Sequence, residues 1–239
     1  SLDGLDISRI PLNPAQFRLR GEARGDFARV EISPGRIAAQ GEGVADIFGG
    51  KVIVKDVSIV DPFQKGRAFV LNANLVDLDL KEITDSVPFG EVTGIIRGEI
   101  RDLSFSYGQP ERFNLRLESV KREGVPQTFS LKAVDNITVI SSGEPASLGT
   151  GQFWMRFIKG FRYDKIGIVS SLKNDTFTLN GTIKDNGVEY LVKKPGPFGI
   201  NVINRMPEKK ISFKEMTRRL KRVGQSGKTE SENQRREKR

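Results

Sequence analysis

Apolar and polar residues alternate along most of this chain, and this period of two constrains the fold more than any other feature. Successive side chains of a β-strand point to opposite faces, so the alternation predicts strands that bury one face. The clearest apolar runs are Phe17 and Leu19; Phe69, Leu71, Ala73 and Leu75; Phe113, Leu115 and Leu117; and Phe177, Leu179, Gly181 and Ile183. We therefore predict a mainly β chain.

Compact turn signals separate these runs. They are Ser33-Pro34-Gly35, Phe48-Gly49-Gly50, Gly108-Gln109-Pro110, Asn174-Asp175 and Asn186-Gly187. Asn-Gly between two alternating runs is a strong signal for a two-residue β-hairpin. We predict one long, twisted and curling antiparallel sheet, an open half-barrel or groove, that occupies residues 1–205 as a continuous domain.

The stretch from Glu91 to Tyr107 is predicted as one long strand. Ile96, Gly98 and Ile100 face one way, but the apolar phase slips by one residue after Arg101 and Asp102. A β-bulge at this point would restore the pattern, and bulged strands suit a strongly twisted sheet. The glycines at positions 90, 94 and 98 do not fit a strict strand face, so we expect bends or close backbone contacts there.

Helical insertions are predicted near residues 80–86, 131–141 and 152–161, where apolar residues recur at helical spacing. The third insertion is rich in aromatic side chains: Phe153, Trp154, Phe157 and Phe161. Such a stripe is typical of core packing, and it also fits contact with a membrane or a partner. The sequence fits both interpretations.

A C-terminal amphipathic helix is predicted over residues 206–223. Ser212 and Glu215 form a capping box, and the polar face of the helix carries Arg218 and Arg219 among other basic residues. This helix could cover the end of the sheet or lie on an anionic membrane. Residues 224–239 have the composition of a disordered basic tail.

The distribution of charge argues against a nucleic-acid partner. The net charge is +9, but twelve of the 39 basic and five of the 30 acidic residues follow position 207. The preceding 27 basic and 25 acidic residues almost cancel. A phosphate-binding groove needs basic residues clustered on the fold itself, so we expect no nucleic acid to bind.

The chain contains no His and no Cys. This composition excludes disulfides, thiolate nucleophiles, Ser-His-Asp triads and His/Cys zinc sites. Asp77 and Asp79 flank Leu78, and Asp135 precedes Asn136, but neither pair has companions for acid-base or metal chemistry. We expect no catalytic residues, no metal and no cofactor.

The first residues lack the basic and apolar regions of a secretory signal. Apolar stretches of the length that spans a bilayer are also absent from the sequence. We expect the chain to be part of a longer protein, with any membrane anchor outside it.

Two segments resemble the C-terminal region of AsmA-like bacterial envelope proteins, especially those of the YdbH type. They are FGEVTGIIRGEIRDLSFSYGQPERFNLRLESV, residues 89–120, and FRYDKIGIVSSLKNDTFTLNGTI, residues 161–183. The pattern Val76-Asp77-Leu78-Asp79-Leu80 before the first segment, and the run from Leu131 to Phe161, add to the resemblance. It covers residues 40–223, and the basic tail departs from the pattern.

The resemblance implies a bridge-like lipid-transfer protein, anchored in the inner membrane and extending through the bacterial periplasm. It implies that phospholipids or other acyl lipids move between the inner and outer membranes along an apolar groove. On this hypothesis acyl chains would contact Ile96, Ile100, Phe105, Phe113, Leu115 and Leu117.

Two other interpretations remain. The chain could be a structural or interaction module in outer-membrane protein assembly or secretion, pairing with envelope proteins through an exposed sheet edge along residues 91–107. A carboxylate-based hydrolase would instead need two acidic residues that converge in a cleft. The alternation itself fits an open apolar groove and a filled core equally well.

Overall fold

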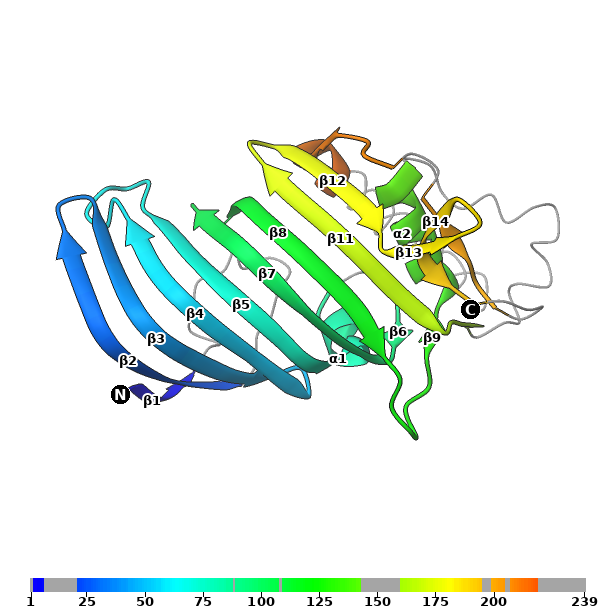
Figure 1. The fold of residues 1–239 in the computed structure, drawn as a ribbon, viewed down its shortest axis with the longest axis horizontal. Coiled ribbons are helices and arrows are strands. Elements are labelled where there is room, and N and C mark those ends of the chain that lie inside the picture. Colours follow the sequence, from blue (N-terminus) through cyan, green and yellow to red (C-terminus); the bar gives the residue numbers. More distant parts are fainter. Residues whose placement is uncertain are drawn as a thin grey trace, which may run out of the picture.

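The structure is a computed structural model that describes residues 2–6, 21–87, 89–107, 109–142, 160–194, 199–204 and 207–218. A large antiparallel sheet dominates these residues and extends across the whole view in Figure 1. The sheet is open and not closed into a barrel, and only short helices accompany it. The predicted fold class, a mainly β chain with a long antiparallel sheet, is confirmed.

Ten strands form the main path of the sheet. In spatial order they are β1 (Leu2–Asp6), β2 (Glu22–Ser33), β3 (Arg36–Ile47), β4 (Gly50–Val60), β5 (Ala68–Asp79), β7 (Ile95–Ser106), β8 (Gln109–Val120), β11 (Lys165–Lys173), β12 (Thr176–Gly181) and β16 (Ile211–Ser212). A branch of β13 (Ile183–Asp185), β14 (Val188–Lys193) and β15 (Val202–Ile203) joins through the pairing of β14 with β11.

The hairpins form where the sequence carries turn residues. Asn186 and Gly187 have φ values of 49° and 77°, the left-handed pair that a tight hairpin between β13 and β14 requires. Asn174 and Asp175, with φ values of 49° and 63°, join β11 and β12 in the same way. These turn predictions are confirmed.

The predicted long strand over residues 91–107 is two strands, so that prediction is wrong. Val92–Thr93 forms β6, and β7 begins at Ile95. Gly94 between them has a φ of 131°, and a Cβ there would lie 2.1 Å from the hydroxyl of Tyr163. The bulge predicted near Arg101 and Asp102 is confirmed, because the register with β8 shifts there.

β6 belongs to a second, small sheet with β9 (Thr128–Phe129) and β10 (Phe161–Arg162). Phe161 was predicted to end a helix, and this prediction is wrong: Phe161 pairs with Phe129. Phe161 and Tyr163 continue a strand-like alternation, and the Tyr163 ring packs on Phe129 at 5.2 Å between centroids. Residues 152–159 of that predicted helix lie outside the described residues.

Two predicted helices are confirmed. They are α1 (Leu80–Asp85), whose N-cap Asp79 accepts a hydrogen bond from the Lys81 backbone N–H at 2.7 Å, and α2 (Leu131–Ser142). The C-terminal helix is also present, but within residues 207–218 it occupies only 213–218. It begins later than predicted because Ile211 and Ser212 pair with β12 as β16.

Candidate functional site

One face of the main sheet is apolar from β2 to β8. The strand register places four rows of apolar side chains on this face, and we call it the apolar face. The rows are Ala23–Ala45–Val52–Leu75–Gly98–Leu117–Ile168; Gly25–Gly43–Val54–Ala73–Ile100–Leu115; Val30–Ala39–Val57 with Leu71–Leu103; and Ile32–Ile37–Ile59–Phe69–Phe105–Pro110. No residue of these rows is charged.

The apolar face is covered at its C-terminal end. Leu172 and Phe177, which pair across β11 and β12, are buried beneath Met216 and Phe213 of the C-terminal helix and Ile140 of α2. A second buried cluster, around Leu191, Val192, Ala133 and Phe129, joins α2, the small sheet and the β14 branch to Ile168 and Leu179 of the sheet. Figure 1 shows α2 beside β12, at the end of the sheet remote from β2.

Over β2, β3, β4 and β5 the apolar face is not covered in this way. Within the part of the chain that the structure describes, neither buried cluster includes a residue of these four strands. Val52, Val54, Leu71 and Leu75 on this side are half-buried and Phe69 is exposed, whereas Ala73 and Leu78 of β5 are buried. The face is therefore packed at one end of the sheet, and most of its residues at the other end are accessible.

The six residues predicted to contact acyl chains all lie on the apolar face. Ile100, Phe105, Leu115 and Leu117 are half-buried within its rows. Ile96, which pairs with Leu78 of β5, is only 4% exposed. Phe113 packs against the cluster at the covered end, with its ring 6.4 Å from that of Phe177. Four of the six positions therefore remain accessible.

The sequence prediction missed the accessible residues on β2, β3 and β4, such as Val52, Val54 and Val57. Their signal is weaker because Gly and Ala occupy many of the neighbouring apolar positions, including Gly25 and Gly43. Alternation was nevertheless present in β4, where Val52 and Val54 are followed by Val57 and Ile59.

The opposite face of the sheet, here the polar face, carries the charged residues. Adjacent strands place opposite charges together: Lys51 lies 3.4 Å from Asp46, and Lys55 lies 3.2 Å from Glu42. These side chains are about half exposed, so such pairs contribute little to stability. The sheet thus has one apolar face and one face that carries its charged residues, although Ser58 and Ser104 on the polar face are buried.

Aspartates stand at the bulges. Asp56, Asp77 and Asp102 have φ values of 54°, 54° and 52°, and the register shifts beside each of them. Asn72 links two of them on the polar face: its amide nitrogen donates to Asp56 at 3.5 Å, and its oxygen accepts the Asp102 N–H at 2.9 Å.

The candidate carboxylates have structural partners. Arg97 and Arg122 both donate to the Asp77 carboxylate, and the hydrogen bond from Arg97 is the main cause that holds the pKa of Asp77 below its usual value. Asp79 caps α1. Within the described ranges, no three His, Cys, Asp or Glu residues cluster as a metal site would require.

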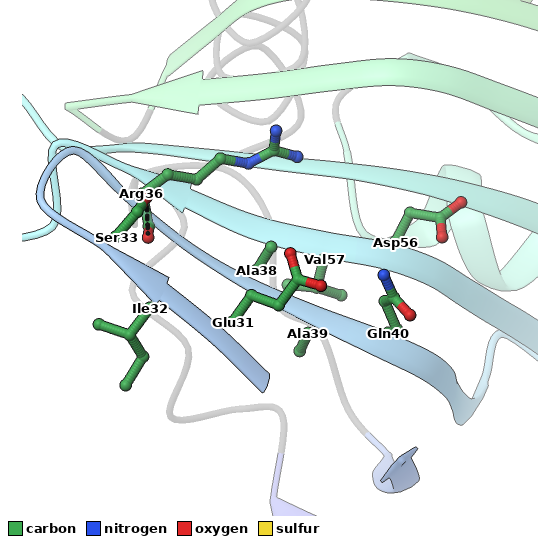
Figure 2. A pocket seen from close by; sticks show the side chains of 9 residues that line it. All are labelled: Glu31, Ile32, Ser33, Arg36, Ala38, Ala39, Gln40, Asp56 and Val57. Carbon is green, nitrogen blue, oxygen red and sulfur yellow. Dashed lines mark hydrogen bonds between the residues drawn. The ribbon is translucent and has the colours of Figure 1, made fainter. Parts of the chain in front are cut away.

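A hollow lies around the β2–β3 hairpin, at the edge of the sheet that the described residues form (Figure 2). It is lined by residues of β2, β3 and β4: Glu31, Ile32, Ser33, Arg36, Ala38, Ala39, Gln40, Asp56 and Val57. In Figure 2, Arg36 and Asp56 lie on one side of the strands and Ile32 points to the other. The hollow therefore lies where the polar face and the apolar face meet.

The residues predicted to contact a membrane or partner are mostly beyond the described ranges. Phe153, Trp154, Phe157 and Arg219 are not among the described residues. Phe161 is half-buried beside the core. Arg218 is exposed and pairs with Glu215 at 2.7 Å.

Comparisons with protein-family models, curated proteins and solved structures found no match to this chain. Among the described residues, no helix has both the length and the apolar character to cross a membrane.

Proposed function

We propose that this chain binds the acyl chains of lipids on the accessible part of its apolar face. The observation that carries the proposal is the set of uncharged rows on this face: three of the four rows cross β2 to β8 in register, and most of their residues are half-buried. Six strands at a spacing of about 4.8 Å make these rows about 24 Å long. A contiguous accessible apolar surface of this kind marks a binding site in a soluble protein.

The chemistry of the rows favours an acyl chain as the ligand. They offer no charged group to orient a polar ligand, and the Phe27 ring, which lies over Gly25 and Gly43, adds a further apolar surface. Each methylene group that leaves water contributes about 0.8 kcal/mol. A lipid headgroup could remain in water beyond the rows.

The resemblance to AsmA-like envelope proteins suggests the biological setting. We propose that the chain is the periplasmic part of a protein anchored in the inner membrane, conducting phospholipid between the inner and outer membranes. The apolar rows supply a path of the kind that this setting requires.

The test compares two substitutions at adjacent residues of β4. Val54 lies on the apolar face and Ile53 on the polar face, and both are half-buried. Val54→Lys should reduce the binding of a fluorescent phosphatidylethanolamine and the lipid that co-purifies in native mass spectrometry, because a charge would lie on the acyl path. Ile53→Lys should change neither.

A wild-type protein that carries no lipid and binds no fluorescent phospholipid would overturn the proposal. Equal loss in both variants would also contradict it, since only one of them alters the apolar face. A photo-reactive side chain at Leu75 should crosslink lipid, whereas the same group at Asn74, on the other face, should not.

The edge of the sheet favours a second candidate function, a structural module that binds a protein strand. The edge predicted for this role was residues 91–107, but β7 lies between β5 and β8 and cannot accept a further strand. In the described part of the chain β1 pairs with β2 only at Glu22–Gly25, so the remainder of β2 is a free edge. A photo-reactive group at Glu31 should capture a protein if this function holds, and only lipid or nothing if it does not.

A further inference from the structure

Exposed apolar side chains gather at one end of the strands. Among the described residues, the structure has six exposed large apolar side chains, and five lie in or near the loops after β2, β4 and β7: Val30, Ile32, Phe63, Phe69 and Tyr107. In Figure 1 the arrowheads of these three strands point toward this end. We call the loop residues 33–36, 61–67 and Tyr107 the rim. The sixth exposed side chain, Ile203, belongs to β15.

The rim loop over residues 61–67 holds a fixed conformation. The Asp61 N–H donates to the Gly35 carbonyl at 2.9 Å, which joins the loop to the neighbouring hairpin. Two turns follow, with Gln64 N–H donating to Asp61 at 3.0 Å and Arg67 N–H donating to Gln64 at 3.2 Å. The first turn places Phe63 at its tip, where 85% of the side chain is exposed.

Tyr107 presents a second ring beside this loop. Its side chain is 75% exposed, and its backbone φ of 50° is unusual for an aromatic residue. Gly66 packs against it, because a Cβ on Gly66 would lie 3.0 Å from the Tyr107 hydroxyl. The Ser106 hydroxyl also donates to the Gly66 carbonyl at 3.4 Å. The two aromatic rings therefore belong to one connected structure.

The rim also carries basic side chains without acidic partners. Lys65 and Arg67 are exposed, and neither forms an ion pair with a described residue. Arg36 donates to the Ser58 hydroxyl at 3.4 Å and likewise forms no ion pair within the described ranges. On the polar face, by contrast, basic residues such as Lys51 and Lys55 pair with carboxylates. The rim contains one carboxylate, Asp61, and three basic side chains, so among the described residues it has an excess of positive charge that can attract anions.

We propose that the rim docks on the surface of an anionic lipid bilayer. Phe63 and Tyr107 would enter the headgroup region, where aromatic side chains are favoured. Lys65 and Arg67 would lie against the lipid phosphates, and each basic residue near such a surface favours binding by about fivefold. Two rings together with basic residues combine buried apolar area with attraction to anionic lipids, and binding at the bilayer surface depends on both. This docking does not depend on acyl binding along the apolar face.

The experiment measures co-sedimentation of the protein with vesicles. The wild type should bind vesicles of equal parts phosphatidylglycerol and phosphatidylcholine more tightly than vesicles of phosphatidylcholine alone, and salt should weaken the binding. The double variants Phe63→Ser/Tyr107→Asn and Lys65→Ala/Arg67→Ala should each bind at least about tenfold more weakly. Asn at position 107 keeps a residue that tolerates the positive φ.

Two control variants match these changes away from the rim. Ile203→Ser removes an exposed apolar side chain of β15, and Lys184→Ala removes an exposed basic residue of β13. Both should bind vesicles like the wild type. Val54→Lys should also bind vesicles normally, which separates bilayer docking from the proposed acyl binding. A wild type that does not prefer anionic vesicles would overturn the proposal, and so would rim variants that bind normally or controls that lose binding equally.

Discussion

Three aspartates fix the places where the strands bulge. Asp56, Asp77 and Asp102 adopt left-handed backbone conformations, which cost little for a short polar side chain and more for most others. Their carboxylates point to the polar face, where arginine or asparagine side chains bond them. Each bulge shifts the alternation by one residue, so apolar side chains before and after it remain on the same face.

Asp77 allows the charge and the backbone conformation to be tested separately. Asp77→Asn keeps a residue that tolerates positive φ but loses the charge that Arg97 and Arg122 contact, so we expect a loss of about 1 kcal/mol in the free energy of unfolding at neutral pH. Asp77→Ala should lose about 1 kcal/mol more because of the strained φ. Thermal or urea unfolding of both variants measures the two contributions.

The effect of Asp77→Asn should depend on pH. The pKa of Asp77 is lower in the folded protein than its ordinary value of 3.8. A lowered folded pKa means that the charged carboxylate stabilises the fold fully above 3.8 and loses this contribution as pH falls through the folded pKa. The difference between Asp77→Asn and the wild type should therefore shrink in acid. A difference that stays constant would show that the charge is not its cause.

The sequence contains a readable signal for these bulges. Ile100 and Leu103 are three residues apart on one face, and the predicted bulge at Asp102 followed from that slip. The same slip separates Val54 from Val57 around Asp56, and Leu75 from Leu78 around Asp77. The sequence shows Asp77 only as an acidic neighbour of Asp79 without companions, because the arginines that bond its carboxylate are 20 and 45 residues away and are invisible to a local pattern.

At the scale of elements, the sequence correctly predicted the features that depend on residues close together in the chain, such as helix caps and helix positions. The capping residue Ser212 accepts the Glu215 N–H at 3.2 Å, and α1 and α2 lie where helical spacing placed them. The break between β6 and β7 depends on a distant contact instead. Gly94 bends because Tyr163, 69 residues later in the sequence, occupies the space beside it and donates its hydroxyl to the Thr93 carbonyl at 2.8 Å.

The C-terminal helix should contribute to stability through one side chain. Met216 is 8% exposed and packs on Leu172 and Phe177 of the sheet. Met216→Ala should lower the free energy of unfolding by about 2 kcal/mol, because a buried side chain of this size leaves a cavity. Lys214→Ala, on the exposed side of the same helix, is the matched control and should change little. Equal stability of the two variants would mean that the helix does not cover the sheet.

At the scale of the whole molecule, periodicity predicts an apolar face but not what lies on it. The alternation of β4 resembles that of β12, yet Val54 is half-buried and Phe177 is 6% exposed. The difference arises from α2 and the C-terminal helix, which pack only at the end of the sheet where β8 meets β11. The paired residues of β8 and β11 are about fifty residues apart in the sequence, so no local pattern could predict which part of the apolar face is covered.

A side chain in the buried cluster at the covered end and a side chain on the accessible part of the apolar face should respond differently to the same substitution. Leu191 is fully buried in the cluster at the covered end, and Leu191→Lys would place a charge where no water or counter-charge can reach it. This variant should fail to fold. Val54→Lys on β4 can extend its ammonium group into water along the accessible face, so its free energy of unfolding should fall by only about 1 kcal/mol.

Circular dichroism and thermal unfolding of the two purified variants make the comparison. If the apolar face is accessible at Val54, the Val54→Lys variant should be folded and the Leu191→Lys variant should be unfolded. If Val54→Lys also fails to fold, Val54 is enclosed in a filled core. The apolar rows over β2 to β5 would then stabilise the sheet, leaving no room for an acyl chain.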